Sequence, residues 1–381
     1  MLSFTKTSAA LVLSGAGAVK LSSDAASAPW FQYEKSEAPA VAIPLPDHGM
    51  LPMTVIGSYP KPAEYDGTDW FKAKSAETAP GGGMSLTKAV TDQNSAILSG
   101  ALKSEDQHNI LTDGMKAWFQ EQESLGIYIP GDGEMGRENY IYALLRNCAG
   151  VNFETLTEVN LRGVHVETVP STVDVPTLLP EEQLGQHVAT PVQEFLRSKE
   201  MQRQAAAEMF QRSNKQVQES FVRDVKITLP GPMTICDSHS IKPKYEEDYD
   251  GYKAAVTAYA VIVKEWVRRL VAAGAKNIQI DEPVFSRETR YEAAIDYGID
   301  LLDDILSPTE GTDVTTTVHI CLGYPMKVDH NEYEHAQPKR YEELAPKLDA
   351  TKHLHWVALE DGGGVNRVEL FQMFTRKTVE K

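Results

Sequence analysis

The sequence predicts an α/β fold, a TIM-type (β/α)8 barrel in which about six of the eight units are present. Short β-branched runs that end in Gly, Pro or an acid alternate with amphipathic segments, which is typical of a parallel sheet. A polar or charged residue follows each run, and in a barrel these positions meet at one mouth. No glycine-rich phosphate turn follows the first run, because Gly57-Ser58-Tyr59-Pro60 does not fit G-x-G-x-x-G.

Six runs are expected to be the strands. They are Met53-Ile56, Ile127-Pro130, Val225-Leu229, Asn277-Ile280, Thr315-Ile320 and His355-Leu359. The polar residues at their ends are Ser58, Glu134, Thr234, Asp281, His319 with Cys321, and Glu360. An open doubly wound sheet is the alternative, and the convergence of these polar residues on one mouth favours the barrel.

Three helices are expected between the runs. A capping box at Ser104 precedes an apolar stripe that ends at Gly126. A second stripe over residues 256–270 ends before Gly274. A long polar helix is expected over Pro191-Val222. Helices at these places fit a strand–helix–strand repeat.

Composition excludes several classes of function. The chain has 381 residues with 37 Lys and Arg against 54 Asp and Glu, which gives a formal net charge of −17. Such an acidic chain is not expected to bind nucleic acid or an anionic membrane, because both require clustered basic residues. Three cysteines are too few for a disulfide scaffold, and no run of 18 apolar residues is present to span a membrane.

The N-terminal region is expected to differ from the barrel. Residues 1–28 combine a slightly basic start, a weak apolar run and a small-residue site at Ala25-Ala28, as in a targeting leader. Such a leader would direct the protein to an organelle (plastid or mitochondrion) or to the secretory route. A disordered tail on a cytoplasmic protein is the alternative. Residues 29–50 contain four prolines and are expected to be a linker, so that the barrel spans residues 51–381.

His319 and Cys321 are the clearest sign of a metal site. Residues two apart on a strand point to the same side, so one imidazole and one thiol would face the same place. Glu360 follows the next run and would add a carboxylate from the neighbouring strand. Three mixed ligands with an open fourth position are typical of a catalytic zinc, which would hold a bound thiol as a thiolate. A buried His and Cys without a metal is the alternative.

Two acids on other runs are candidates for binding an amine or acting as a general base. Asp281, with Glu282 after it, ends a buried run, and the alternative is that it caps the next helix. Glu134 lies in the glycine turn of residues 131–137, and the alternative is an ordinary surface turn. The Pro-Gly-Pro turn of residues 230–232 indicates only that the backbone is constrained there.

In combination these segments resemble the catalytic barrel of the cobalamin-independent methionine synthase family. The matching segments are Thr54-Pro60, Gly131-Glu134, Leu229-Thr234, Ile278-Pro283, His319-Cys321 and Leu359-Asp361, in the order found in the family. Two further stretches, residues 321–325 and 344–349, most resemble the short members that have a single barrel. The resemblance implies a barrel of the methionine synthase and uroporphyrinogen decarboxylase kind.

The resemblance also implies an activity. Members of the family transfer a methyl group from a donor, usually 5-methyltetrahydrofolate, to homocysteine and so make methionine, with Zn²⁺ bound to the homocysteine sulfur. The metal ligands would be His319, Cys321 and Glu360. The residues that bind the amino-acid part of homocysteine would be Ile56, Gly57, Ser58, Glu134 and Asp281, with the two acids facing its ammonium group. A thiol with a pKa of about 8.5 is mostly protonated at neutral pH, so an activating metal is chemically useful.

The sequence departs from the family pattern in two places. The family has a cysteine on the last strand as a fourth zinc ligand and a histidine on the seventh strand thought to act as the acid. Neither is found, so the catalytic residue is unassigned; only 21 residues follow Glu360, and we expect an incomplete barrel. The aromatic residue that stacks on the pterin is replaced by Cys236-Asp237-Ser238, which leaves the methyl donor open and makes Cys236 an alternative thiolate ligand.

Three functions stay open on the sequence alone. The first is zinc-dependent methyl transfer to homocysteine. The second is a catalytically weakened or inactive barrel that serves as a binding or assembly component of a larger complex. The third is a related zinc-dependent alkyl transfer to, or lysis of, another thiol. A second copy of the chain or a protein partner that completes the barrel is compatible with each of them.

Overall fold

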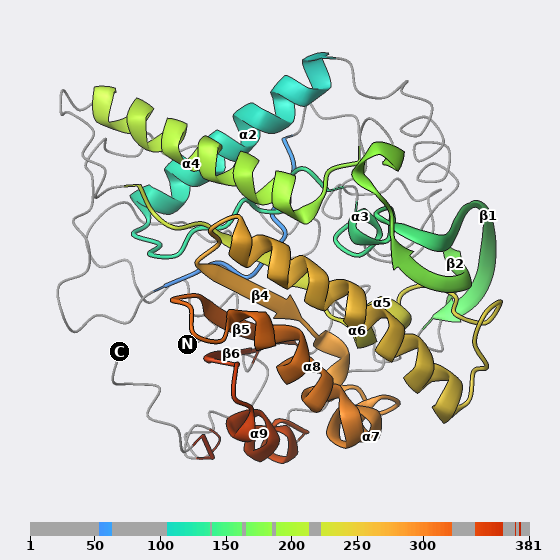
Figure 1. Ribbon diagram of the computed structural model, residues 1–381. Helices are drawn as coiled ribbons and strands as arrows, with labels where there is room; N and C mark the ends of the chain where they lie inside the picture. Colours follow the sequence, from blue (N-terminus) through green and yellow to red (C-terminus); the bar gives the residue numbers. More distant parts are fainter. Residues whose placement is uncertain are drawn as a thin grey trace, which may run out of the picture.

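The computed structural model describes residues 53–62, 105–137, 139–161, 165–184, 188–212, 222–321, 340–360, 370 and 373–374. The expected leader (1–28) and linker (29–50) lie outside the described residues and stay predictions. The described parts consist of a parallel sheet, helices that pack on it, and a long β-hairpin (Figure 1).

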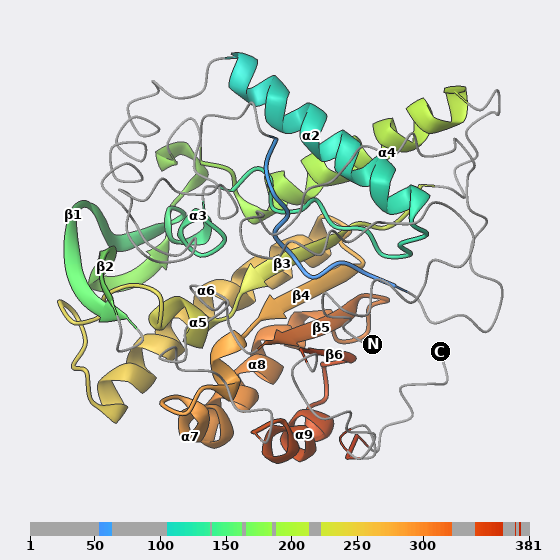
Figure 2. The same cartoon turned by 180° about the vertical axis from the view of Figure 1, so that it is seen from behind.

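The sheet is parallel, and its strands are neighbours in the order of the chain. They are β3 (Lys226–Pro230), β4 (Asn277–Asp281), β5 (Thr315–Ile320) and β6 (Trp356–Leu359). Parallel bridges from Thr54 to Ile129 and from Gly131 to Lys226 extend the same order to the first two runs (Figure 2). The six runs predicted as strands are therefore adjacent in the order expected for a barrel.

The two faces of this sheet differ in polarity, because successive side chains of a strand point to opposite faces. One face carries the buried apolar residues Ile227, Leu229, Ile278, Ile280, Val318 and Ile320, which belong to the main hydrophobic core. The other face carries Lys226, Thr228, Gln279, Asp281, Thr317 and His319, all of them buried. The polar face is the one that holds the candidate site.

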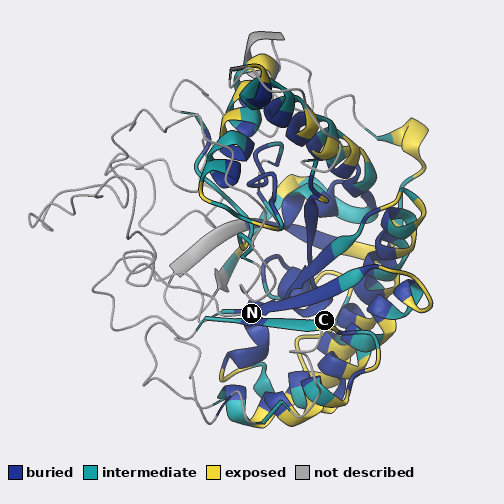
Figure 3. Cartoon of the chain, turned by 90° about the vertical axis from the view of Figure 1, so that its left-hand side faces the viewer, coloured by how far each residue is buried: buried dark blue, intermediate teal, exposed yellow. Residues whose placement is uncertain are grey.

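Helices pack on the apolar face and beyond it (Figures 1 and 3). The longer ones are α2 (Glu105–Ser124), α4 (Pro191–Arg212), α6 (Tyr249–Ala272), α8 (Ile299–Leu306) and α9 (Arg340–Ala350). Asp248 caps the start of α6 by accepting from the Gly251 amide, and Gly274, with φ of 88°, follows its end. The predicted helices around α2, α4 and α6 are confirmed, although Ser104 and residues 213–221 lie outside the described residues.

Several short elements join these units. They are α3 (Tyr142–Leu145), η2 (Glu181–Gln183), α5 (Pro232–Cys236), η4 (Pro283–Ser286), α7 (Tyr291–Ala293), η5 (Ala294–Gly298) and η6 (Ser307–Thr309). Two of them, α5 and η4, directly follow β3 and β4 and so lie at the carboxyl ends of the strands. Among the described residues, none of the helices is long and apolar enough to cross a membrane.

A long antiparallel hairpin is the main element that the sequence does not predict. Its strands are β1 (Cys148–Leu161) and β2 (His165–Leu178), and it projects at one side of the molecule (Figure 1). Pro170 and Pro176 lie inside β2, and a proline in a run argues against a strand unless the strand is at an edge. The hairpin contacts the rest of the chain where the Thr172 amide donates to the Ser240 carbonyl at 2.8 Å.

The expectation of an incomplete barrel concerns residues 361–381. Within that range the structure describes only Leu370, Met373 and Phe374. Leu370 is buried, and the other two are partly buried against the main core. The expectation that two units are missing therefore stays a prediction.

Candidate active site

Glu134 lies in a tight turn that only particular residues can form. Gly133 and Glu134 both have positive φ angles, of 67° and 54°, which is the left-handed region that favours glycine. A Cβ atom on Gly133 would lie 2.8 Å from the Cβ of Tyr59. Oδ1 of Asp132 accepts from the Glu134 amide at 2.9 Å and holds the turn. The glycine turn of residues 131–137 is thus an ordered turn with a buried Glu134 carboxylate, and not an ordinary surface turn.

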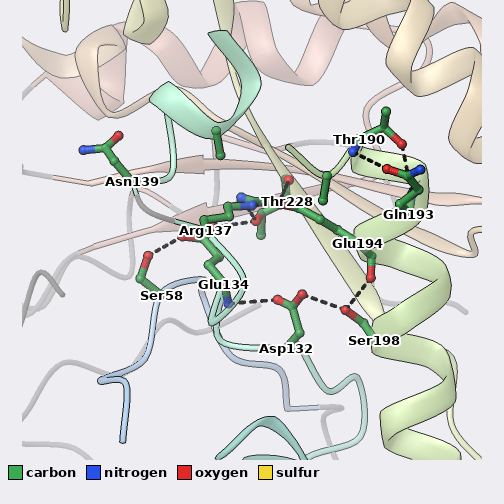
Figure 4. A network of polar contacts seen from close by, with 12 residues as sticks. Ser58, Asp132, Glu134, Arg137, Asn139, Thr190, Gln193, Glu194, Ser198 and Thr228 are labelled. Atoms are coloured by element: carbon green, nitrogen blue, oxygen red, sulfur yellow. Dashed lines mark hydrogen bonds and ion pairs between the residues drawn. The ribbon is translucent and has the colours of Figure 1, made fainter. Parts of the chain in front are cut away.

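The Glu134 carboxylate meets the segment after the first run (Figure 4). The Ser58 hydroxyl donates to its Oε2, and the Thr228 hydroxyl donates to its Oε1 at 2.6 Å. A Cβ atom on Gly57 would lie 3.1 Å from the same carboxylate, so glycine permits this close approach. The structure therefore brings Gly57, Ser58 and Glu134 together, as the sequence predicts.

Arg137 joins this turn to α4 (Figure 4). Its guanidinium group donates to Glu134 at 3.0 Å, to Glu194 at 2.9 Å and to the Thr228 carbonyl at 2.7 Å. Burial alone would lower the pKa of Arg137, but the carboxylates of Glu194 and Glu134 raise it above its usual range. Arg137 is therefore a permanent buried cation beside the carboxylate that the sequence assigns to substrate.

Asp281 belongs to a second network on the polar face. The Gln279 amide nitrogen donates to Oδ1 of Asp281 at 2.6 Å and to the Ile56 carbonyl at 2.9 Å. The Lys226 ammonium group donates to Oε1 of Gln279 at 2.6 Å and to the Val55 carbonyl. Burial raises the pKa of Asp281 and lowers the pKa of Lys226. Through this network Asp281 is linked to Ile56, another residue that the sequence assigns to substrate.

Glu282 has a different role from its neighbour Asp281. Its carboxylate accepts from the amides of Met233 and Thr234, at 3.0 and 2.9 Å, and from the Thr234 hydroxyl at 2.7 Å. These contacts hold the first turn of α5. Burial raises the pKa of Glu282 to about 8. Glu282 thus binds the start of α5, a helix that precedes β4, while Asp281 lies on the polar face. The helix that follows, η4, has no side-chain cap, so the alternative that Asp281 caps the next helix is not supported.

His319 lies beside Asp281 on the polar face, because Asp281 and His319 are paired in the register of β4 and β5. Its Nδ1 atom is buried and has no hydrogen-bond partner among the described residues. Burial, together with the positive charge of Lys226, lowers the pKa of His319 to about 4. A neutral imidazole with an unused ring nitrogen is the form in which histidine binds a metal.

Cys321 and Glu360 follow the ends of β5 and β6, which are adjacent strands. Ile320 pairs with Leu359, and the Glu360 amide donates to the Ile320 carbonyl at 3.2 Å. The backbone thus brings both residues next to the end of the strand that carries His319. Among the described residues, however, no group of three His, Cys, Asp or Glu side chains is close enough to hold a metal ion. The metal-ligand role of these residues stays a prediction.

The alternative of Cys236 as a thiolate ligand is not supported. Cys236 lies in α5 and is buried in the main hydrophobic core. Burial, together with the charges of Glu282 and Asp237, raises the pKa of its thiol well above the usual range. The thiol is therefore protonated and packed as a small apolar side chain.

A hollow opens beside the Glu134 turn. It is lined by Ser58, Tyr59, Lys61, Gly133, Glu134, Arg137 and Tyr140. Tyr59 forms one wall and is stacked on Trp118, with ring centroids 3.6 Å apart. Ser58 and Glu134 both line this hollow, and Asp281 is not part of the lining.

Three charged or polar residues of the site were not identified from the sequence. Two of them, Lys226 and Gln279, could have been predicted. A lysine in a buried run is unusual. Gln279 is two positions before Asp281 and so lies on the same side of the strand. Arg137 had no such signal, because a charged residue in a glycine turn is usually exposed.

Comparison with known proteins finds similarity to one family. The family model described as the catalytic domain of cobalamin-independent synthase matches residues 197–298. The methionine synthase of Sulfurisphaera tokodaii is 26% identical over 290 residues, which is 76% of this chain and 64% of that protein. The methionine synthase of Saccharolobus solfataricus is 27% identical over 274 residues, 72% of this chain and 63% of that protein. The resemblance to the cobalamin-independent methionine synthase family is confirmed by these matches.

The fold of the chain agrees with that of a solved structure. The B12-independent methionine synthase from Shewanella sp. W3-18-1, described as a complex with selenomethionine, superposes with a TM-score of 0.57 at 24% identity. The match covers 86% of this chain and 78% of that chain. The prediction of an α/β barrel of the TIM type is therefore confirmed.

The comparisons cover the site unevenly. The chain spans slightly less than two thirds of the length of the curated relatives. The family model covers β3 and β4, which carry Lys226, Gln279 and Asp281. Ser58, Glu134 and the residues from His319 onward lie outside that match, so their place in the site rests on the geometry.

Proposed function

We propose that the protein transfers a methyl group to the sulfur of homocysteine and so forms methionine. One observation carries the proposal: Ser58, Glu134 and Asp281, from three separate parts of the chain, lie on one polar face at the carboxyl ends of parallel strands, beside His319. Barrel enzymes have their active sites at this end of the strands. Similarity to methionine synthases supports the same reaction.

The amino-acid part of the substrate would bind through the two acids. Carboxylates accept charge-assisted hydrogen bonds from an ammonium group. Glu134 faces the hollow, and Asp281 is linked to the Ile56 carbonyl through Gln279. The Ser58 hydroxyl and the backbone of Gly57 lie at the Glu134 carboxylate and would contact the substrate beside it. These contacts would hold the sulfur toward His319.

A zinc ion would be held by His319, Cys321 and Glu360. The unpartnered Nδ1 of His319 and the adjacent ends of β5 and β6 fit such a site. When bound, zinc lowers the pKa of a thiol and keeps it as a thiolate, which is the nucleophilic form. Replacing Cys321 with Ser should lower the zinc content of the purified protein sharply; full zinc content in that variant would contradict this ligand set.

In the reaction the thiolate sulfur attacks the methyl carbon of the donor. The new S–C bond forms as the bond from the methyl group to the donor breaks. The donor atom that loses the methyl group takes up a proton from solvent, which balances the proton that the thiol released to solvent when it became a thiolate. 5-Methyltetrahydrofolate is the donor that the family resemblance suggests. The Glu134 and Asp281 carboxylates would contribute by orienting the thiolate, since a well-oriented bound reactant reacts faster than a free one.

Methionine formation tests the proposal. The full chain, supplied with zinc, homocysteine and 5-methyltetrahydrofolate carrying a 13C methyl group, should form 13C-methionine. Asp281→Asn should reduce the rate, whereas Asp304→Asn should not, because Asp304 is an exposed residue on α8. Homocysteine binding without any transfer, from folate or from other methyl donors, would contradict methyl transfer and favour a binding component of a larger complex.

A further inference from the structure

A lysine is buried on the polar face of the sheet. Lys226 begins β3, and only 3% of its surface is exposed. Its ammonium group donates to the Val55 carbonyl and to Oε1 of Gln279. A buried charge is strongly unfavourable unless it is paired, so these partners fix the position of the ammonium group. The function proposed above uses Gln279 only as a link between Asp281 and Ile56 and gives Lys226 no role.

Lys226 determines how the Gln279 side chain is oriented. An ammonium group only donates hydrogen bonds, so the amide oxygen of Gln279 must face it. The amide nitrogen then points the other way and donates both of its hydrogens, one to the Ile56 carbonyl and one to Asp281. The reversed orientation would place the amide oxygen against two acceptors, and the amide nitrogen against a cation. Only one orientation of the Gln279 amide therefore satisfies Lys226, Ile56 and Asp281 together with the amide itself.

We propose that Lys226 and Gln279 are positioning residues that hold the Asp281 carboxylate and the Ile56 carbonyl in place for the ammonium group of an amino-acid substrate. The inference rests on the proposed function and deepens it, since it assigns the recognition of the α-amino group to a defined network. A carboxylate accepts several hydrogen bonds and a carbonyl accepts two, so both acceptors keep capacity for a substrate N–H.

The network acts on one end of the substrate. Gln279 contacts Ile56 and Asp281, and both are predicted to meet the amino group rather than the sulfur. Loss of Gln279 should therefore weaken the binding of a thiol that carries an α-amino group and leave a thiol without one unaffected. 4-Mercaptobutanoate is such a thiol, because it has the chain, sulfur and carboxylate of homocysteine but lacks the amino group.

The experiment measures the binding of L-homocysteine and of 4-mercaptobutanoate to the full chain by titration calorimetry. Gln279→Leu should raise the Kd for homocysteine about tenfold, as expected for one misplaced charge-assisted hydrogen bond. Lys226→Met should have a similar effect, because Gln279 is then free to rotate. The double variant should be no weaker than either single variant, because the two residues act as one unit. The Kd for 4-mercaptobutanoate should stay the same throughout.

Thr317→Val is the matched control. Thr317 lies opposite Gln279 in the next strand, on the same buried face, and is outside this chain of hydrogen bonds. The variant should keep the preference for homocysteine. If Gln279→Leu also keeps the preference for homocysteine, or binds both thiols more weakly to the same extent, the positioning role is wrong while the proposed function stands. If the unaltered chain binds homocysteine no better than 4-mercaptobutanoate, the amino-acid site of the proposed function is wrong as well.

Discussion

Replacing Arg137 with Met removes the cation that joins the Glu134 turn to α4. The guanidinium group lies 3.0 Å from Glu134 and 2.9 Å from Glu194, and the three side chains are only 4%, 4% and 11% exposed. Without Arg137, two carboxylates stay buried beside each other without a compensating charge. Removing one partner of a buried ion pair costs about 3–5 kcal/mol for this reason.

Urea unfolding followed by tryptophan fluorescence measures this cost. A loss of about 3–5 kcal/mol is a large part of the 5–15 kcal/mol or so that stabilises a typical protein, so the unfolding midpoint should fall clearly. The loss of unfolding free energy in Arg137→Met should be smaller in mildly acidic buffer. Burial already raises the pKa of Glu194, so this carboxyl is protonated more readily, and a protonated carboxyl carries no unpaired charge.

Arg203→Met is the control for this variant. Arg203 pairs with Glu200 on α4, but the two side chains are 58% and 43% exposed, so the pair contributes little. Its removal should leave the urea midpoint nearly unchanged. If Arg137→Met unfolds at the same urea concentration as Arg203→Met, the buried network does not hold the turn as described.

Three further predictions concern single sites. Asp281→Asn should weaken homocysteine binding without changing the zinc content, and zinc loss in this variant would show that Asp281 is a ligand instead. Gly133→Ala should cost about 1–3 kcal/mol of unfolding free energy, because of its φ of 67° and the contact with Tyr59, so an unaltered urea midpoint would count against the turn geometry. Burial lowers the pKa of His239 to about 4, against about 6.5 in an unfolded chain, so His239 should make the protein less stable as the pH falls from about 6.5 to 4. His239→Gln should flatten that part of the pH–stability profile. A profile identical to that of the unaltered chain would argue against this contribution of His239.

The strands and helices of the barrel follow directly from sequence periodicity. Buried runs such as residues 315–320 are short, rich in β-branched residues and followed by polar positions, so their place could be predicted. The hairpin β1–β2 could not, because Pro170 and Pro176 interrupt a pattern that otherwise alternates. The pairing of β1 with β2 depends on contacts between the two strands, which the local sequence pattern does not predict.

The site could be predicted only in part, because some of its residues depend on tertiary contacts. Glu134, Asp281 and Ser58 stand at the ends of predicted strands, and the structure brings them onto one polar face. The same rule of alternation that paired His319 with Cys321 applies to Gln279 and Asp281, so Gln279 could have been found. Arg137 could not, because whether an arginine is exposed or buried between two acids depends on tertiary packing.

A structure of the full chain with homocysteine bound tests the proposed site most directly. The proposal predicts that the ammonium nitrogen lies within about 3.2 Å of the Glu134 and Asp281 carboxylates and that the sulfur points to His319. A homocysteine bound elsewhere, or bound at this face with its amino group away from both acids, would contradict the proposed recognition and with it the assigned reaction.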